Sequence, residues 1–182
     1  LYNRWRLSSQ WYSYLLPILH GPHLRRADVF KTNQTNGAKV ALRAARLWRK
    51  PLIARCGFMW SEFVGRERGQ ESPQYKHARE VESKVFRAAD RVVVTTSIMR
   101  DELTSRIPGS ADRTLVIPNY VDTSVFKPGS EEREQGRLVF VGRMTSQKNV
   151  AGLLEAIEPI DVRLTLIGDG ELLPELQRRY GT

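Results

Sequence analysis

The stretch Leu138–Asn149 constrains the fold most, because a short apolar run breaks there at a glycine and is followed by cationic residues. Four consecutive apolar residues, Leu138–Val141, predict a strand that is buried on both faces, as in a parallel sheet. Residues 148–157 then carry apolar side chains at helical spacing and predict an amphipathic helix. The stretch therefore predicts a strand, a turn at Gly142 and a helix, which is the basic unit of an α/β fold.

Arg143 and Lys148 flank this turn. In open α/β sheets such turns lie at the carboxyl edge, where ligands bind, and the start of the helix offers free N–H groups and a positive dipole end to an anion. Arg143 could contact two phosphate oxygens and Lys148 could act as a point charge, so that both offset the charge of a departing diphosphate. Gly142, which has no side chain, would let the backbone come close to the phosphate. The alternative is that both cations are solvated and Gly142 only turns the chain.

Charge and cysteine content narrow the class of protein. The 182 residues carry a net charge of +9, which favours an anionic partner such as nucleotide phosphate, nucleic acid or an acidic lipid surface. Nucleic acid is not expected, because the arginines are scattered and form no clustered basic face. Cys56 is the only cysteine, so a reducing compartment is allowed. It has no nearby histidine partner in sequence, and a nucleophilic role is not expected.

The chain has no apolar run near 18 residues and no recognisable leader, which predicts a cytoplasmic protein. It begins with Leu1 and stops at Thr182 directly after a helical pattern, so we expect a piece of a longer protein. Residues 1–20 are rich in aromatic and basic side chains and predict a helix that ends or kinks at Pro17. Two interpretations stay open: the helix packs its apolar side on the domain, or it touches lipid and makes a peripheral contact at the inner face of the membrane.

Strand and helix patterns alternate along the next hundred residues. Expected strands cover residues 28–32, 51–55, 92–95 and 115–117, and expected helices cover residues 38–49, 72–89 and 97–107. Thr35–Gly37 is expected to cap the first of these helices, and Ser97 the third, with Ile98 inward. In the second helix Glu82 belongs to the charges expected on the outside. Residues 56–63, with three aromatic side chains, either line a cleft or form a loop on the core.

A polar linker at residues 127–136, with breakers at both ends, predicts a domain boundary. We therefore expect domains at residues 1–130 and 131–182. The second would contain the strand at Leu138–Val141, the helix at 148–157, a strand at 162–167 and a helix from Glu171. This alternation indicates parallel pairing with right-handed crossovers.

Several motifs in this order resemble family 4 glycosyltransferases with the GT-B fold. The motifs Val92–Ser97 and Val116–Asp122, the second together with Phe126–Pro128, correspond to that family's last acceptor-domain strands and hinge. The start of its donor domain corresponds to Val139–Arg143 with Gln147–Asn149, and to Leu164–Gly170. The resemblance implies an α/β protein with two Rossmann-like domains and parallel sheets, both incomplete in this chain. It also implies a retaining transfer from a nucleotide-diphosphate sugar to a glycan or lipid-linked acceptor in polysaccharide biosynthesis.

The resemblance also implies roles for individual residues. Arg143 and Lys148 match the pair that contacts the donor diphosphate. Gly142 and the turn Gly168-Asp169-Gly170 would lie on the donor side, and Gly57 and Asn119 in the cleft on the acceptor side. No metal and no cofactor are expected, because the two cations would do the work of a metal and the nucleotide sugar is a substrate.

Departures from the family pattern set limits to this interpretation. Tyr120 stands where the family usually has glycine, so the hinge turn differs or Tyr120 points at the acceptor. No catalytic role is assigned to His20, His23 or His77. The family's first glycine-rich loop and its carboxylate pair are missing, so we expect the fragment alone to be inactive. The alternative function is a non-catalytic Rossmann-like module that binds a nucleotide.

Overall fold

The computed structural model describes residues 3, 5–130, 132 and 134–180. The chain divides into two compact units, Leu1–Asp122 and Thr123–Thr182. The division lies before the linker at 127–136 on which the sequence-based boundary rests. Small parts of the predicted N-terminal stretch (residues 1, 2 and 4) and of the linker (131 and 133) lie outside the described residues.

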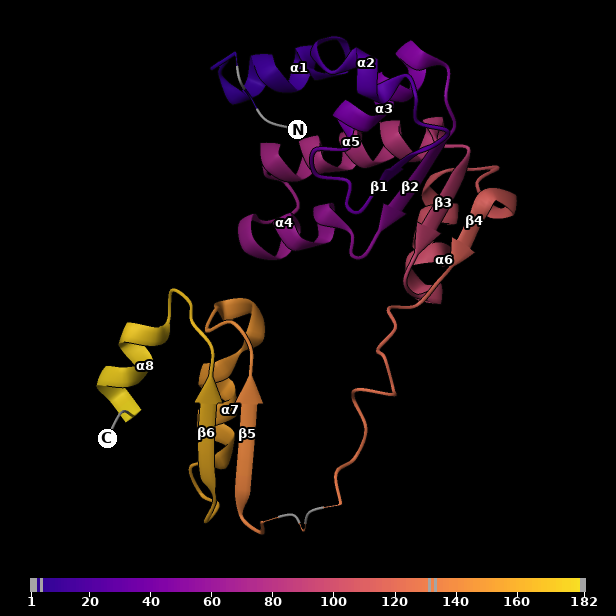
Figure 1. Cartoon of the computed structure of the whole chain (residues 1–182). Helices are drawn as coiled ribbons and strands as arrows, with labels where there is room; N and C mark the ends of the chain where they lie inside the picture. The colour runs from indigo at the N-terminus through magenta and orange to yellow at the C-terminus, as the bar shows by residue number, and fades with distance from the viewer. Residues whose placement is uncertain (1–2, 4, 131, 133, 181–182) are drawn as a thin grey trace. The chain divides into compact units, whose positions relative to one another are not determined.

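The Leu1–Asp122 unit is built on a parallel sheet in the order β1-β2-β3-β4 (Figure 1). The register pairs Phe30 with Leu52, Ile53 with Arg91, and Val92 with Thr114. Each of the four strands predicted in this half is present, with slightly different ends. Their bounds are β1 (Phe30–Thr32), β2 (Leu52–Cys56), β3 (Arg91–Val94) and β4 (Thr114–Val116).

Helices connect these strands and bury apolar side chains against them. Leu52, Phe86 and Leu103 are among the largest fully buried residues of this core. The helices are α1 (Ser9–Leu19), α2 (Gly21–Leu24), α3 (Lys39–Trp48), α4 (Trp60–Arg68), α5 (Pro73–Ala88) and α6 (Ser97–Arg106), with a short 3-10 turn at Ala111–Arg113. Among the described residues, no helix is both long and apolar enough to cross a membrane.

Helix α1 continues past Pro17, so of the two predicted effects of this proline, ending or kinking the helix, the first is wrong. A proline has no N–H, so the carbonyl of Ser13 one turn earlier loses its helical partner. Arg43 of α3 donates a hydrogen bond from Nη1 to that carbonyl at 3.3 Å, and Trp48 donates from Nε1 to the Pro17 carbonyl at 3.0 Å. Two side chains of α3 thus hold α1 through its proline, and the helix continues to Leu19.

Helix starts and faces differ from prediction at several positions. Thr96, not Ser97, caps α6, because its side chain accepts from the Met99 N–H, and Ile98 is 77% exposed rather than inward. No side chain caps α3, so the expected cap from the turn at residues 35–37 is absent. Glu82 is completely buried, although the charge pattern placed it outside. The aromatic stretch at residues 56–63 runs into α4, a helix that was not predicted.

The Thr123–Thr182 unit contains two parallel strands, with Leu138 paired to Leu164. Its core is small and consists of Met144, Val150, Leu154 and Leu176 with half-buried neighbours. The elements are β5 (Arg137–Val141), a 3-10 turn η2 (Ser146–Lys148), α7 (Val150–Ile157), β6 (Arg163–Ile167) and α8 (Leu173–Tyr180).

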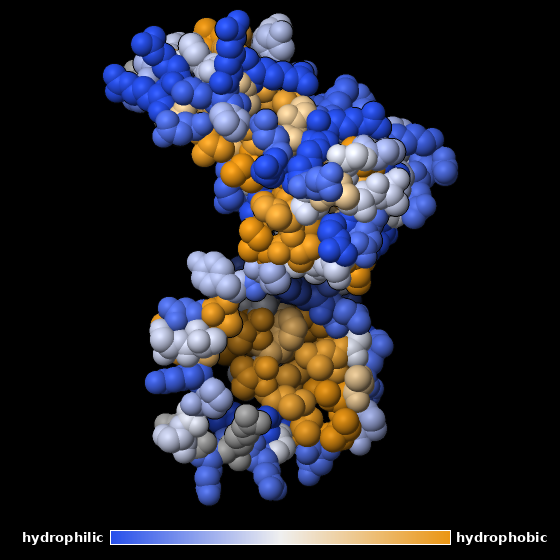
Figure 2. Space-filling view, turned by 90° about the vertical axis from the view of Figure 1, so that its right-hand side faces the viewer, coloured by the Kyte–Doolittle hydropathy of each residue, from blue (hydrophilic) through white to orange (hydrophobic). Residues whose placement is uncertain are grey.

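The prediction that Leu138–Val141 is buried on both faces is wrong for this chain. Val139 is 56% and Val141 74% exposed, because their side chains have no layer packed over them. Figure 2 shows a broad apolar surface in the lower half of the view, where this unit is drawn. Ile167 of β6 is also half exposed. The apolar run is typical of a buried strand, but in this chain one face of the strand is exposed.

Candidate functional site

The loops that follow β5 and β6 are joined backbone to backbone. The Gly142 N–H donates to the Ile167 carbonyl at 2.9 Å, and the Met144 N–H donates to the Asp169 carbonyl at 2.8 Å. The Leu172 N–H in turn donates to the Met144 carbonyl at 3.0 Å. Hydrogen bonding between the strands thus continues beyond their carboxyl ends, and the predicted donor-side residues of both loops share one edge of the sheet.

Gly168 and Gly170 are required for this close approach. Their φ angles are +147° and +155°, which side-chain-bearing residues rarely adopt. A Cβ at Gly168 would stand within 3.0 Å of the Gly142 carbonyl oxygen, and one at Gly170 equally close to the Met144 backbone. The Asp169 carboxylate accepts from the Gly170 N–H at 2.7 Å and stabilises the turn.

Arg143 and Lys148 are both exposed on the loop between β5 and α7. Arg143 donates from Nη2 to the side-chain oxygen of Gln147 at 3.1 Å, which holds the guanidinium along the loop. Lys148 ends the 3-10 turn, and α7 begins at Val150 with no side-chain cap. Among the described residues, no carboxylate lies within 4.0 Å of either cation. Two unpaired cations and uncapped helical N–H groups can bind a phosphate here.

A second edge lies in the Leu1–Asp122 unit, at the carboxyl ends of β1 to β4. The Gly57 N–H donates to the Gln34 side chain at 3.3 Å, and the Thr95 hydroxyl donates to the Gly57 carbonyl at 3.1 Å. Arg55 donates from Nη2 to the Asn119 side-chain oxygen at 2.8 Å. Gly57 and Asn119, both predicted from sequence, therefore lie at this edge.

Gln34, Arg55 and Thr95 were missed by sequence reasoning, although each lies at or just after the end of a predicted strand. Tyr120 follows Asn119, and its side chain is 94% exposed. His20 is buried beside Tyr12, whose hydroxyl lies 2.8 Å from His20 Nε2, which suits a structural role. No group of three or more metal-ligating side chains occurs in the part of the chain that the structure describes.

Buried polar groups fix the backbone that follows Gly57. The Glu82 carboxylate accepts from the Ser61 N–H at 2.9 Å, from the Ser61 hydroxyl at 2.7 Å and from Arg106 Nη2 at 3.0 Å. The Cys56 thiol donates to the Phe58 carbonyl at 2.8 Å, and burial, with a contribution from the charge of Glu82, raises its pKa to about 12. A thiol that stays protonated is a poor nucleophile.

Comparison with known proteins decides the family. The sequence model of Glycosyltransferase Family 4 matches residues 1–125, more than half of the chain. The chain belongs to Glycosyltransferase Family 4. The family predicted from the motifs is therefore confirmed.

Two curated proteins of Mycolicibacterium are similar in sequence. The chain is 33% identical over 117 residues to an alpha-maltose-1-phosphate synthase of M. smegmatis, an alignment that covers 56% of this chain and 30% of that protein. It is 28% identical over 138 residues to an MMP alpha-(1->4)-mannosyltransferase of M. hassiacum, covering 73% of this chain and 29% of that protein. The family 4 chain thus spans less than a third of these relatives.

Solved structures share the fold. Anabaena Alr3699/HepE in complex with UDP-glucose superposes with a TM-score of 0.67 at 18% identity, covering 93% of this chain and 48% of that one. The lipopolysaccharide outer core galactosyltransferase WaaB, in its apo form, gives 0.60 at 19% identity, with 92% and 43% covered. The predicted fold class, α/β of the GT-B type, is confirmed, and the chain covers about half of these structures.

Proposed function

We propose that this family 4 chain is part of a retaining glycosyltransferase that moves a sugar from a nucleotide-diphosphate sugar to a glycan or lipid-linked acceptor. Family membership supports a sugar transfer, and the fold neighbour HepE was solved with UDP-glucose. The observation that carries the proposal is the pair of unpaired cations, Arg143 and Lys148, on a loop that is fixed to the turn Gly168–Gly170.

Each side chain has a role in the proposed reaction. Arg143 presents a planar fork to two diphosphate oxygens, and Lys148 adds a point charge beside the uncapped start of α7. Both stabilise the negative charge that grows on the diphosphate as the bond to the sugar breaks, which is where preorganised charge accelerates a reaction most. In this proposal the two cations do the work of a metal ion, and the nucleotide sugar is a substrate rather than a cofactor.

Acceptor binding is assigned to the carboxyl edge of the first sheet. Gly57 leaves room beside Gln34, where a Cβ would come within 3.0 Å of the amide nitrogen, and Arg55 holds Asn119 at the same edge. We further propose that the enzyme acts in the cytoplasm in polysaccharide biosynthesis, with a peripheral contact at the inner face of the membrane through α1. This helix exposes Trp11, Tyr14 and Ile18 at helical spacing, on one face.

The test uses the full-length protein with a panel of nucleotide sugars and acceptors. Arg143→Ala and Lys148→Ala should each lower turnover by at least ~10²-fold, the scale expected for a preorganised charge partner. Arg163→Ala is the matched control, because it removes the same charge from the amino end of β6 and should leave turnover unchanged. Wild-type turnover in both loop variants would refute the mechanism, and a product of inverted anomeric configuration would refute retention.

A non-catalytic nucleotide-binding module remains the competing function. It predicts that the full-length protein binds a nucleoside diphosphate through Arg143 but releases none from any nucleotide sugar in the presence of acceptors. For the 182-residue chain by itself we expect no acceptor-dependent release above a no-protein control, because binding that does not position the sugar against an acceptor contributes little to rate.

A further inference from the structure

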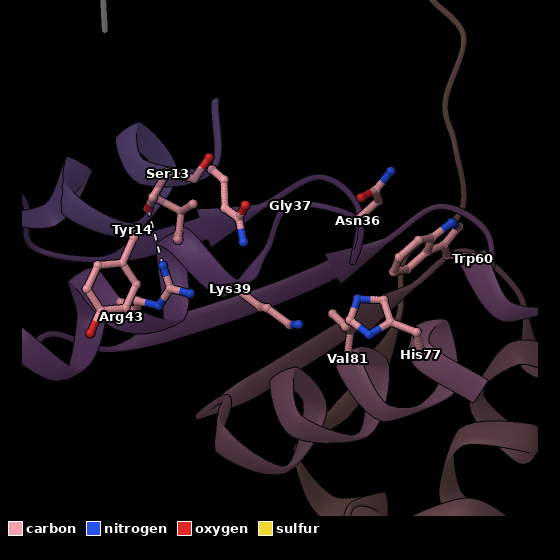
Figure 3. A pocket seen from close by; sticks show the side chains of 11 residues that line it. Ser13, Tyr14, Asn36, Gly37, Lys39, Arg43, Trp60, His77 and Val81 are labelled. Carbon is pink, nitrogen blue, oxygen red and sulfur yellow. Dashed lines mark hydrogen bonds between the residues drawn. The ribbon is translucent and has the colours of Figure 1, made fainter. Parts of the chain in front are cut away.

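A pocket of about 430 Å³ opens between helices α1, α3 and α5 of the Leu1–Asp122 unit, with Trp60 at the start of α4 on its wall (Figure 3). Its lining includes two cationic side chains, Lys39 and Arg43, and the imidazole ring of His77, which carries an N–H donor. No aspartate or glutamate lines it. The pocket therefore concentrates donors for an anion, and none of the residues assigned above to transfer contributes to it.

Arg43 is held in a fixed orientation at this pocket. Its Nη1 donates to the Ser13 carbonyl at 3.3 Å, the carbonyl that Pro17 leaves without a helical partner. Its guanidinium lies over the Tyr14 ring, 4.7 Å from the ring centre. The side chain is half-buried, and the remaining guanidinium N–H groups keep the planar fork that contacts two oxygens of one anion.

Lys39 and His77 complete the donor set from two other positions. Lys39 is half-buried at the first residue of α3 and forms no ion pair within 4.0 Å among the described residues. Figure 3 shows its side chain extending toward the ring of His77. The His77 ring stands edge-on to Trp60, with ring centres 6.0 Å apart.

Glu80, an acidic side chain on α5, is paired with Lys84. Glu80 lies one turn after His77 and accepts from Lys84 at 2.5 Å. That hydrogen bond, with smaller contributions from Lys39 and His77, lowers the pKa of Glu80. The Glu80 carboxylate thus has Lys84 as its hydrogen-bond partner, and it forms no ion pair with Lys39 within 4.0 Å.

We propose that this pocket binds a phosphate monoester. A carboxylate has two oxygens, whereas a phosphate monoester presents three, which suits donors that come from α3, α5 and the fork of Arg43. The rings of Tyr14 and Trp60 provide flat walls for the organic part of the ester. The proposal is independent of sugar transfer, and it holds or fails whether or not the diphosphate binds at Arg143.

The test is isothermal titration of the 182-residue chain with glycerol 3-phosphate and with inorganic phosphate, at constant ionic strength. Arg143→Ala/Lys148→Ala serves as the background throughout, so that the candidate donor site adds no signal. In this background we expect Lys39→Gln and Arg43→Gln to weaken binding by at least ~10-fold each, equal to about 1.4 kcal/mol. Arg46→Gln is the matched control on α3, because Arg46 is exposed and lies outside the pocket.

A second arm identifies the source of the phosphate. Vesicles of phosphatidylcholine with phosphatidic acid present a monoester, and vesicles with phosphatidylserine of equal charge do not. Binding of glycerol 3-phosphate that depends on Lys39 supports a soluble ligand, and Lys39-dependent preference for phosphatidic acid supports a lipid headgroup. The proposal is overturned if neither probe responds to Lys39→Gln and Arg43→Gln, or if Arg46→Gln has the same effect.

Discussion

Removing Arg106 should destabilise the Leu1–Asp122 unit more than any loss of an exposed ion pair. Arg106 is 9% exposed and donates at 3.0 Å to Glu82, whose side chain is fully buried. In Arg106→Ala the carboxylate keeps both bonds from Ser61 but loses its only cation within 4.0 Å among the described residues. Breaking a buried ion pair by removing one partner costs about 3 to 5 kcal/mol, which is a large part of the free energy of unfolding of a domain, about 5 to 15 kcal/mol.

The assay is urea unfolding followed by tryptophan fluorescence. All tryptophans of the chain, Trp5, Trp11, Trp48 and Trp60, belong to the Leu1–Asp122 unit, so the signal reports this unit alone. Lys84→Ala is the control, because it breaks the exposed pair with Glu80 and should change the free energy of unfolding very little.

The reasoning would be refuted if the free energy of unfolding of Arg106→Ala lay within about 1 kcal/mol of that of the Lys84→Ala control. Glu82→Leu/Arg106→Leu gives a second check of the cause. Because this variant buries no charge, it should be more stable than Arg106→Ala, as expected when a buried ion pair is replaced by apolar side chains. A double variant at least as unstable as Arg106→Ala would show that lost packing, rather than the unpaired carboxylate, explains the effect.

Three further outcomes are expected. The pKa of the Cys56 thiol is about 12 in the folded state against 9.0 in the unfolded state, so the free energy of unfolding should fall as the pH rises from 9.0 toward 12. Because the buried thiol stays protonated, iodoacetamide should modify Cys56 at mildly alkaline pH only in urea. Gly168→Ala should weaken the β5–β6 pair by about 1 to 3 kcal/mol, seen as faster amide hydrogen exchange in both strands; unchanged exchange would contradict the close approach. The unmodified protein should sediment with anionic vesicles at low salt and should be released from them as the salt concentration rises. Replacing Trp11, Tyr14 and Ile18 by serine should abolish this sedimentation. Sedimentation that does not depend on salt or on lipid charge would contradict the lipid contact.

Local patterns predicted the strands and the turn at Gly142, because both depend on residues that are close in sequence. Apolar runs marked β2 and β3, and the break at Gly142 correctly predicted that Arg143 follows the carboxyl end of a strand. The burial of Glu82 could not be predicted in this way. Its spacing matches a solvated face, and its partners Ser61 and Arg106 come from helices before and after its own.

Long-range partners explain the other differences. Asn119 was placed in the cleft by its motif, but its hydrogen bond to Arg55 joins residues 64 positions apart. Helix α4 escaped prediction because its stretch has few apolar residues at helical spacing, and its first turn is fixed by Glu82 from α5. The exposed strand face at Val139 and Val141 differs for another reason, since an apolar run indicates what a strand can bury and not what covers it.

The backbone hydrogen bonds between the loops after β5 and β6 divide their positions into those that can be substituted and those that cannot. Gly142, Gly168 and Gly170 hold the frame through main-chain atoms, whereas Arg143 and Lys148 project from it as exposed side chains. Substitutions at the exposed positions leave the main-chain hydrogen bonds intact, so one frame can present different chemical groups to different donors. An engineer would therefore keep the glycines for the frame and the two cations for the proposed reaction, and would vary other exposed positions of the loop, such as Ser146.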